Sequence, residues 1–350
     1  MPVGDTQLTQ MFEHVLTLSK VDATQSVAVL KSHYSNPRIV RAAMDAAQRL
    51  GAQVYGVELP AVHDPRAASN DLTAIVGKTP LTGNAAAKEA LMAADLVVDT
   101  MMLLHSPEQG EILASGTRML LAVEPPETLA RMLPAEEDKA RVNAAAQMLK
   151  AASSLRVTSK AGTDFSARLG QFPVMTEYGF ADEPGRWDHW PSGFLFSWPN
   201  EGSAEGTIVL DVGDILLPFK RYVESRVTLE IVEGYIRKIH GGFDADYLRT
   251  YMDQFDDPEV HALSHLGWGL QPRAQWTALG LNDKDASIGM DARAFEGNFL
   301  FSTGSNTEVG GLRNTPCHMD IPMRHCTVSL DGRPVVIDGK TVDIPAANNA

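Results

Sequence analysis

The stretch from Ser26 to Leu59 reads SVAVLKSHYSNPRIVRAAMDAAQRLGAQVYGVEL, and it decides the fold of the first half of the chain. The apolar runs at 26–31 and 52–59 are typical of strands. Between them, residues 36–51 carry apolar side chains at helical spacing and end in Gly51, where a helix is expected to stop. A strand, a helix and a second strand in this order predict two parallel strands covered by the helix that connects them.

The same alternation continues to about residue 160. Further strands are expected at 95–104, 117–124 and 154–160, and further helices at 84–94 and 134–152. We therefore predict an α/β domain with a mainly parallel sheet over residues 1–160. No G-x-G-x-x-G follows the first strand and no G-x-x-x-x-G-K occurs in the sequence, so a nucleotide-binding role for this domain has no support.

The character of the chain changes after residue 160. Gly, Trp and Pro become frequent, and antiparallel strands are expected at 206–218, 226–239 and 326–339. The last segment contains Asp331-Gly332 between alternating apolar residues, which predicts a tight hairpin turn. One helix, at 243–255, interrupts the β pattern. We predict a second, β-rich α+β domain over residues 161–350.

Composition narrows the classes of protein that this chain can belong to. Its 350 residues are 44% hydrophobic and 21% charged, which is typical of a soluble protein with a full core. The net charge of −14 argues against nucleic acid or an anionic membrane as a partner, because both attract clustered Lys and Arg. Two Cys make no disulfide framework and the first residues are polar, so we expect a cytoplasmic location.

The segment 313–326, RNTPCHMDIPMRHC, concentrates residues that can bind a metal. On an extended chain His318 and Asp320 point to the same face, so both could contact one ion. A third ligand has to come from elsewhere, and His265 is a candidate in the segment 264–276, whose glycines suggest a turn. No C-x-x-C is present, which excludes the common structural zinc patterns, and both Cys are expected to be packed in the core.

The segments 191–214, 264–272 and 315–323 resemble the thermophilic-type metallo-aminopeptidase superfamily. The resemblance implies a metallo-aminopeptidase-like fold for the second domain. Members of that superfamily hold two metals with two Glu, a His and a His-x-Asp pair. Here the first Glu position corresponds to Phe194, the second to His265, and the separate His to Asn298. What remains is His265, His318 and Asp320, a set of two imidazoles and one carboxylate that suits a single Fe(II) and leaves positions open for substrate and O₂.

Longer segments at 11–35, 97–109, 177–201, 265–281 and 306–322 resemble the family of 2,5-dihydroxypyridine 5,6-dioxygenases over nearly the whole chain. That resemblance implies Fe(II)-dependent cleavage of 2,5-dihydroxypyridine by O₂ to N-formylmaleamate, a step of nicotinate and nicotine degradation. It also favours a homo-oligomer.

Three further residues are candidates for catalysis. His105 follows the apolar segment 95–104, at the end of a parallel strand where α/β sheets carry functional loops. We expect either His105 or His189 to act as general base and acid, and Glu177 to bind the ring nitrogen or the 2-oxygen. One or two of the aromatic residues in 186–198 and 265–276 should line the pocket, while the others pack in the core.

Two other functions fit parts of the sequence. A metallo-aminopeptidase-like hydrolase using zinc or cobalt would keep the same fold, but it needs the carboxylates that Phe194 and His265 replace. A binding protein without catalytic activity on the same scaffold would have no need of the three metal ligands.

Overall fold

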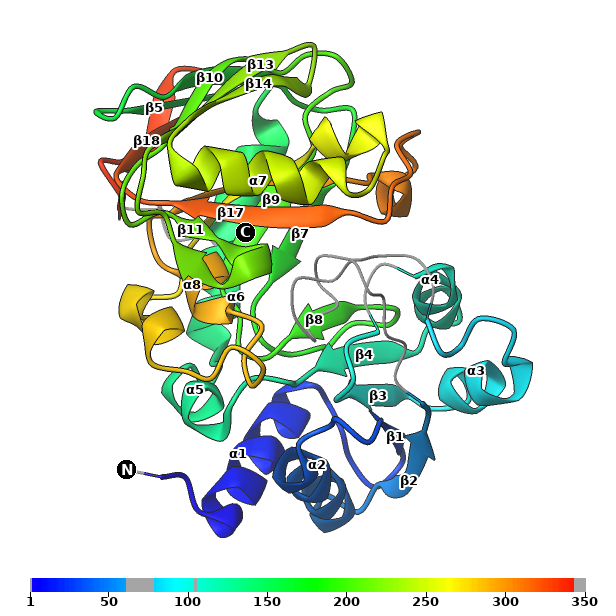
Figure 1. Ribbon diagram of the computed structural model, residues 1–350. Coiled ribbons are helices and arrows are strands. Elements are labelled where there is room, and N and C mark those ends of the chain that lie inside the picture. The colour runs from blue at the N-terminus through cyan, green and yellow to red at the C-terminus, as the bar shows by residue number, and fades with distance from the viewer. Residues whose placement is uncertain (1, 61–78, 104–105, 343–350) are drawn as a thin grey trace.

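The computed structural model describes residues 2–60, 79–103 and 106–342. Figure 1 shows an α/β part built around one parallel sheet, and beside it a β-rich part with two larger antiparallel sheets. The predicted fold class, an α/β region followed by a β-rich α+β region, is confirmed. None of the helices in the described ranges is both long enough and apolar enough to cross a membrane.

The first sheet has five strands, all paired in parallel, in the order β2-β1-β3-β4-β8. Its strands are β1 (Ser26–Lys31), β2 (Gln53–Glu58), β3 (Leu96–Asp99), β4 (Arg118–Leu121) and β8 (Trp187–His189). The strand–helix–strand unit expected around Ser26–Leu59 is therefore present, with β1 and β2 side by side.

Helices cover both faces of this sheet, which explains why its central strands are apolar on both sides. Val27 and Val29 of β1 pack with the first two helices, whereas Ala28 and Leu30 pack with the third and fourth. These helices are α1 (Asp5–Leu18), α2 (Pro37–Arg49), α3 (Ala85–Met92) and α4 (Pro107–Ala114). Asn36 caps α2 by accepting a hydrogen bond from the backbone N–H of Arg38, as its position before Pro37 favours.

The strand expected at 154–160 exists as β5, but it belongs to a different sheet. It pairs antiparallel with β6 and β18, and the fifth parallel strand is β8, which comes from beyond residue 160. The reason is visible in β5 itself: buried Leu155 and Val157 flank the exposed Arg156, an alternation typical of a sheet with one face in water. The division of the chain at residue 160 stays a prediction.

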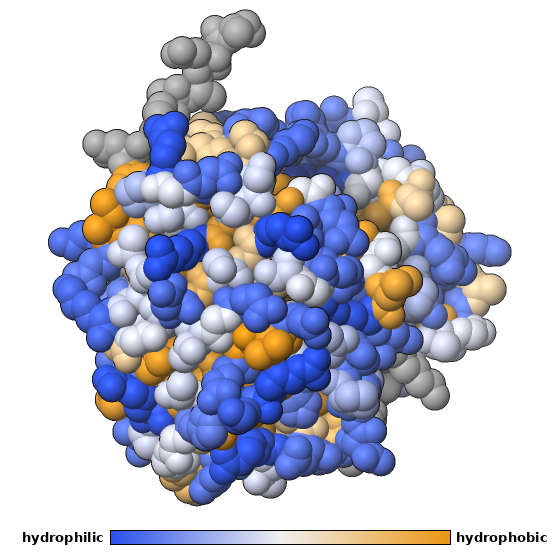
Figure 2. Space-filling model, turned by 90° about the horizontal axis from the view of Figure 1, so that it is seen from above, coloured by the Kyte–Doolittle hydropathy of each residue, from blue (hydrophilic) through white to orange (hydrophobic). Residues whose placement is uncertain are grey.

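The largest sheet has eight antiparallel strands in the order β14-β13-β10-β6-β5-β18-β19-β20. The strands are β5 (Ser154–Ser159), β6 (Asp164–Arg168), β10 (Glu205–Leu210), β13 (Val227–Val232), β14 (Tyr235–Gly241), β18 (Cys326–Leu330), β19 (Arg333–Ile337) and β20 (Lys340–Thr341). Asp331 and Gly332, with φ of 47° and 82°, form the predicted hairpin turn between β18 and β19. The face of the molecule in Figure 2 is mostly polar with scattered apolar patches.

The third sheet, of five strands, carries most of the chemistry. Its order is β17-β16-β15-β9-β7, with β7 (Val174–Glu177), β9 (Phe194–Ser197), β15 (Leu263–Gly269), β16 (Phe299–Gly304) and β17 (His318–Met323). One face packs on the eight-stranded sheet, where Phe165 of β6 lies 6.5 Å from Phe299 of β16 between ring centroids. Strands β9, β15, β16 and β17 are buried along their whole length, so the other face is covered as well.

The remaining elements connect and cover the sheets. They are α5 (Pro126–Arg131), α6 (Glu136–Ala151), α7 (Phe243–Asp253), α8 (Met290–Ala294), the short pair β11 (Ile215–Leu216) and β12 (Arg221–Tyr222), and several 3-10 turns. Helix α7 is the one predicted at 243–255. The 174–198 segment passes from the third sheet (β7) to the parallel sheet (β8) and back (β9). It therefore ties the two parts of the molecule together where the pocket lies.

Candidate metal centre and substrate pocket

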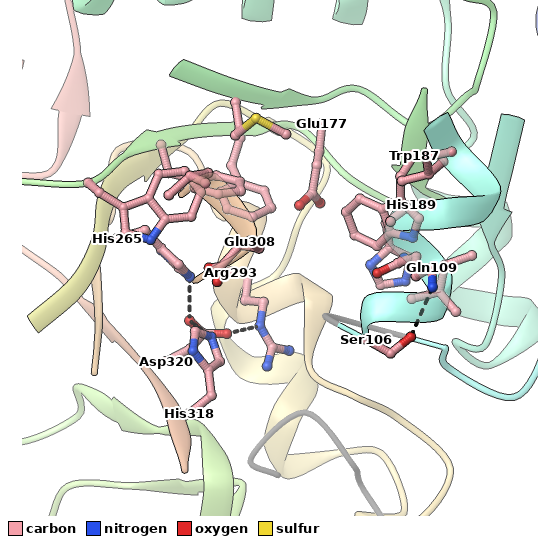
Figure 3. Close-up of a pocket in the computed structure, with 18 of the residues that line it drawn as sticks. Ser106, Gln109, Glu177, Trp187, His189, His265, Arg293, Glu308, His318 and Asp320 are labelled. Atoms are coloured by element: carbon pink, nitrogen blue, oxygen red, sulfur yellow. Dashed lines mark hydrogen bonds and ion pairs between the residues drawn. The ribbon is translucent and has the colours of Figure 1, made fainter. Parts of the chain in front are cut away.

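Three buried side chains meet on the covered face of the third sheet. His318 and Asp320 project from β17 two residues apart, and His265 projects from β15 (Figure 3). His265 Nε2 lies 3.3 Å and His318 Nε2 3.4 Å from Asp320 Oδ1, and one ligand atom from each residue falls within 4.8 Å of the others. Two imidazoles and one carboxylate in this geometry can hold one metal ion.

His265 lies in the middle of a buried strand, so the turn expected around it is wrong. Gly267 and Gly269 are glycines because neighbouring backbone comes too close for a side chain. A Cβ at Gly267 would lie 2.0 Å from the carbonyl oxygen of Leu195, and one at Gly269 would lie 2.2 Å from that of Phe295. The glycines therefore permit close packing of β15 instead of a change in chain direction.

Arg293 of α8 completes the centre and was not anticipated from the sequence. Its Nε donates a hydrogen bond of 2.6 Å to Asp320 Oδ2, and it also donates to the carbonyl oxygen of Ile288. Burial opposes ionisation of Asp320, yet the Arg293 guanidinium and the imidazole of His318 hold the pKa of this carboxyl well below its usual range. Asp320 is therefore a carboxylate with one oxygen fixed by Arg293 and the other directed at the two imidazoles.

The donor set fits a metal ion on two observations. Within the described part of the chain, Asp320 Oδ1 accepts no hydrogen bond of good geometry although it is buried, and His265 Nδ1 has no partner. Burial lowers the pKa of His265, which favours the neutral imidazole that coordinates a metal. A buried carboxylate oxygen facing two imidazole nitrogens, without a hydrogen bond of its own, is the arrangement that a cation satisfies.

The three candidate metal ligands, His265, His318 and Asp320, line one side of a pocket of about 630 Å³, a volume typical of small-molecule sites. Both parts of the molecule contribute walls. Much of the apolar lining comes from β4, β8, β9 with the residue after it, and the start of α8 with the segment before it: Leu121, Trp187, Phe194, Phe196, Trp198, Ile288 and Met290. Phe194 and Phe196 are stacked 5.1 Å apart. Such walls suit a flat ring.

Two polar side chains enter this pocket from β7 and β8 (Figure 3). Glu177 is 5% exposed and its Oε2 accepts a hydrogen bond of 2.9 Å from Ser192 Oγ. Burial, together with the nearby charge of Asp188, raises the pKa of Glu177 well above its usual value. His189 is 2% exposed, and burial lowers its pKa to about 3, so its ring is neutral at working pH. His189 Nε2 has no hydrogen-bond partner among the described residues.

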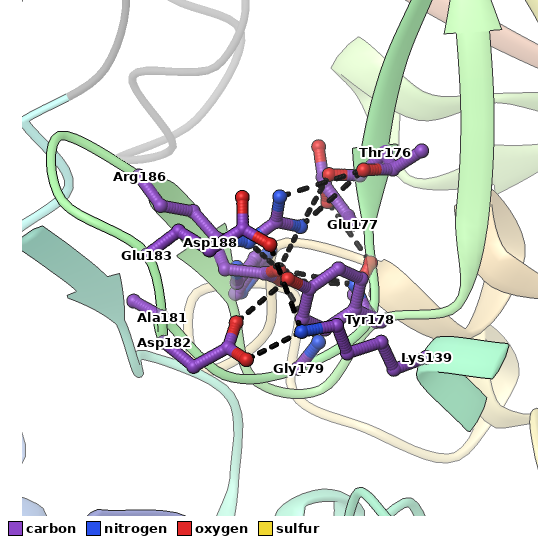
Figure 4. A network of polar contacts seen from close by, with 12 residues as sticks. Lys139, Thr176, Glu177, Tyr178, Gly179, Ala181, Asp182, Glu183, Arg186 and Asp188 are labelled. Carbon is purple, nitrogen blue, oxygen red and sulfur yellow. Dashed lines mark hydrogen bonds and ion pairs between the residues drawn. The ribbon is translucent and has the colours of Figure 1, made fainter. Parts of the chain in front are cut away.

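A polar network behind these two residues fixes their strands (Figure 4). Asp188 accepts hydrogen bonds from the backbone N–H groups of Tyr178, Gly179 and His189 and pairs with Arg186 at 2.6 Å. Its carboxylate is therefore fully used in holding the turn between β7 and β8, and it does not contact the His189 ring as an orienting partner. The side chains of Glu177 and His189 are thus presented on a rigid support.

Residues 7–343 match the family described as 2,5-dihydroxypyridine 5,6-dioxygenase. The chain belongs to this family. It is 70% identical, over 98% of both sequences, to the 2,5-dihydroxypyridine 5,6-dioxygenase of Pseudomonas putida. The solved structure of the 2,5-dihydroxypyridine dioxygenase from that organism covers 99% of this chain and is itself covered completely, with a TM-score of 0.97 and 69% identity. The predicted family is confirmed.

A second solved structure, AmpT from Thermus thermophilus, shares the fold of this dioxygenase-family chain. It has a TM-score of 0.60 at 15% identity and covers 96% of the chain. Phe194 and Asn298 stand where the superfamily resemblance predicts metal ligands. Phe194 forms part of the pocket wall. Asn298 is a structural brace: its side chain accepts from the backbone N–H of Gly269 and donates to the carbonyl oxygens of Ala292 and Arg293.

The structure brings five of the six predicted site residues of the dioxygenase-family chain to one pocket: Glu177, His189, His265, His318 and Asp320. The sixth, His105, lies outside the described residues. Four aromatic residues of 186–198 line the pocket, Trp187, Phe194, Phe196 and Trp198, which is more than the one or two expected, while Trp190 and Trp268 are core residues as expected of the others. Both Cys are free and buried, as predicted.

Proposed function

We propose that this protein is a ring-cleaving dioxygenase that opens 2,5-dihydroxypyridine between C5 and C6. Both atoms of O₂ enter the product: C5 becomes the carboxylate and C6 the formyl group of N-formylmaleamate. The observation that carries the proposal is the buried group of His265, His318 and Asp320 beside an aromatic-walled pocket, in a chain of this family. The hydrolase alternative is not favoured, because one imidazole has taken the place of a carboxylate ligand.

The metal that we assign to these ligands is Fe(II). Two imidazoles and one carboxylate would hold Fe(II) and leave other positions open, and the bound ion would allow electrons to pass from the substrate ring to O₂. The chain contributes the fixed orientation of the ligands: Arg293 holds Asp320 Oδ2, and the strand pair β15 and β16 holds His265 through a hydrogen bond of 2.8 Å from its backbone N–H to Ser302 Oγ.

Acid–base roles follow from the environment of each candidate. His189 is too weak a base to hold a proton taken from a hydroxyl group, because burial keeps its pKa at about 3. We therefore assign it a hydrogen bond to the bound ring, and we assign the proton transfer to His105, the other histidine that the sequence offers as a general base. Glu177 binds the edge of the ring that carries nitrogen. The apolar walls keep the ring flat against Phe194 and Phe196.

We expect the enzyme to act in the cytoplasm as a homo-oligomer with 2,5-dihydroxypyridine and O₂ as its partners. The two free, buried thiols suit a reducing compartment. A net charge of −14 is unfavourable for binding nucleic acid. Light scattering of the purified protein measures its mass in solution, and a monomer at working concentration would contradict the oligomer.

Oxygen uptake tests the proposed reaction. Metal-free protein is loaded with Fe(II) under anaerobic conditions, then given 2,5-dihydroxypyridine and air. We expect one O₂ consumed for each ring lost, with no uptake by the Zn(II)-loaded protein. Verified iron binding without any uptake would sink the reaction, and cleavage of an aminoacyl-nitroanilide by the Zn(II) or Co(II) form would favour the hydrolase.

Substitution of each ligand tests the site. His265→Ala, His318→Ala and Asp320→Ala should lose iron and turnover together, whereas the control His240→Ala, on the exposed surface of β14, should keep both. An active variant with a full complement of iron at any of the three positions would remove that residue from the ligand set. His105→Ala should keep iron and lose rate, and unchanged turnover would exclude it from proton transfer.

A further inference from the structure

Glu177 is a buried carboxyl group with an unused face. It stands at the end of β7 and points into the pocket beside the metal ligands rather than among them (Figure 3). Ser192 Oγ donates to Oε2, and within the described part of the chain Oε1 has no hydrogen-bond partner. One oxygen of the carboxyl group is therefore held from behind, while the other remains for a ligand in the pocket.

Among the described residues, no Lys or Arg side chain forms an ion pair with Glu177. The nearest guanidinium on the same support, that of Arg186, donates to Asp188 at 2.6 and 3.0 Å and to the carbonyl oxygen of Thr176 at 2.8 Å. It also stacks on the ring of Tyr178 at 3.7 Å, which leaves none of it for Glu177. A buried carboxylate without an ion-pair partner and close to the Asp188 charge is unstable, so the group takes up a proton.

The charged groups of the metal centre act on Glu177 in opposite directions. The Arg293 guanidinium favours ionisation of Glu177, but it is bound to Asp320, whose negative charge opposes it. His189 is neutral and adds no positive charge. The raised pKa of Glu177 agrees with this arrangement of contacts.

We propose that Glu177 acts as a neutral carboxylic acid that recognises the lactam edge of the substrate, and so selects the 5-hydroxy-2-pyridone tautomer of 2,5-dihydroxypyridine. The acid O–H on Oε1 donates to the oxygen on C2, and Oε2, which already accepts from Ser192, accepts the N1–H with its second lone pair. A carboxylic acid and a lactam match as two parallel hydrogen bonds. This inference rests on the proposed function, since it takes its substrate from there.

The pairing also orients the ring in the pocket. C5 lies opposite C2 across the ring, so a ring held by N1 and C2 presents C5 and its hydroxyl group on the side away from Glu177. With Glu177 beside the metal ligands and not among them, this hydroxyl-bearing carbon can be directed toward the ligands. Glu177 is thus a specificity-determining residue that binds the substrate and exchanges no proton with it.

Anaerobic binding separates this role from catalysis. Wild type, Glu177→Gln and Glu177→Leu are loaded with Fe(II), and Kd is measured without O₂ for 2,5-dihydroxypyridine, N-methyl-5-hydroxy-2-pyridone and 3-hydroxypyridine. Gln keeps one donor and one acceptor, so its Kd for the substrate should stay within about threefold of wild type. Leu should raise Kd by about ten- to a hundredfold, which is the worth of two hydrogen bonds, and should bind the substrate and the N-methyl compound equally.

Controls distinguish the possible outcomes. Glu183→Gln, an acid with a 62% exposed side chain on the same connection, should leave every Kd unchanged. If Glu177→Gln binds as weakly as Glu177→Leu, the group acts as a carboxylate and the inference is wrong. Wild type that binds the N-methyl compound as tightly as the substrate overturns it as well, even where a variant fails to fold. Loss of oxygen uptake in the wild type would instead refute the proposed function.

Discussion

His189 should make the stability of the fold depend on pH by an amount that follows from its burial. The residue is 2% exposed, and burial, reinforced by the Arg293 charge, lowers its pKa to about 3. In an unfolded chain an imidazole titrates near pH 6.5. Below that value the unfolded chain binds a proton that the folded protein excludes. This contribution to stability is therefore complete above about pH 6.5 and is lost as the pH falls toward 3.

Well inside that window, each pH unit lowers the free energy of unfolding by about 1.4 kcal/mol. Going from about pH 7.5 to about pH 4.5 therefore lowers it by roughly 2–3 kcal/mol through His189 alone. In His189→Gln the side chain stays polar but cannot titrate. The free energy of unfolding of metal-free protein is measured by urea denaturation at these two pH values. The loss between them should be roughly 2–3 kcal/mol smaller in the variant than in wild type.

A matched control removes a histidine that the fold does not bury. His33 is exposed after β1, and His33→Gln should lose as much stability on acidification as wild type does. If His189→Gln also loses as much as wild type, then the fold does not exclude the proton from His189. The assignment of His189 as a neutral hydrogen-bonding group in the pocket would then fall with it.

Other perturbations test the support of the metal centre. Gly267→Ala would place a Cβ 2.0 Å from the carbonyl oxygen of Leu195, so thermal denaturation should show a free energy of unfolding lower by about 1–3 kcal/mol or more. A variant as stable as wild type would contradict the close approach of β9 and β15. Arg293→Met leaves the carboxylate of Asp320 buried without its guanidinium, so urea denaturation should show a free energy of unfolding lower by about 3–5 kcal/mol. Metal analysis should show iron affinity reduced about 10- to 100-fold. An iron-replete variant of normal stability would refute this role of Arg293. The two buried thiols should react with a thiol reagent only after unfolding, and rapid reaction in the native protein would show that they are accessible.

The features that could be predicted from the sequence are those that depend on short-range patterns. The strand–helix–strand unit around α2 is specified by apolar spacing, the Asn36 cap and the glycine at 51, all within one continuous stretch. The extended His318-x-Asp320 pair needs only the two-residue repeat of a strand. In both cases neighbours in the sequence are also neighbours in the structure.

The features that escaped prediction depend on contacts between distant segments. Gly267 resembles a turn residue in the sequence, and only the approach of Leu195 explains it as part of a strand. Arg293 lies 27 residues from Asp320, and no local pattern marks an arginine that will be buried against a carboxylate. The membership of β5 in an antiparallel sheet was open to prediction, because apolar Leu155 and Val157 alternate with polar residues in the sequence, unlike the continuous apolar run of a central parallel strand.

The pocket exists because one short segment belongs to two sheets. Glu177 ends β7, His189 ends β8 and Phe194 begins β9, so three walls of the pocket come from about twenty consecutive residues. The middle strand of this segment pairs in parallel with β4, while the flanking strands pair in the third sheet next to β15, which carries His265. Without β8, the edge of β4 would lack its partner, and the polar wall would lose its place opposite the metal ligands. The α/β part therefore contributes to catalysis by holding one side of the pocket at a fixed distance from the other, and this explains why the chain needs both parts to bind a single small ring.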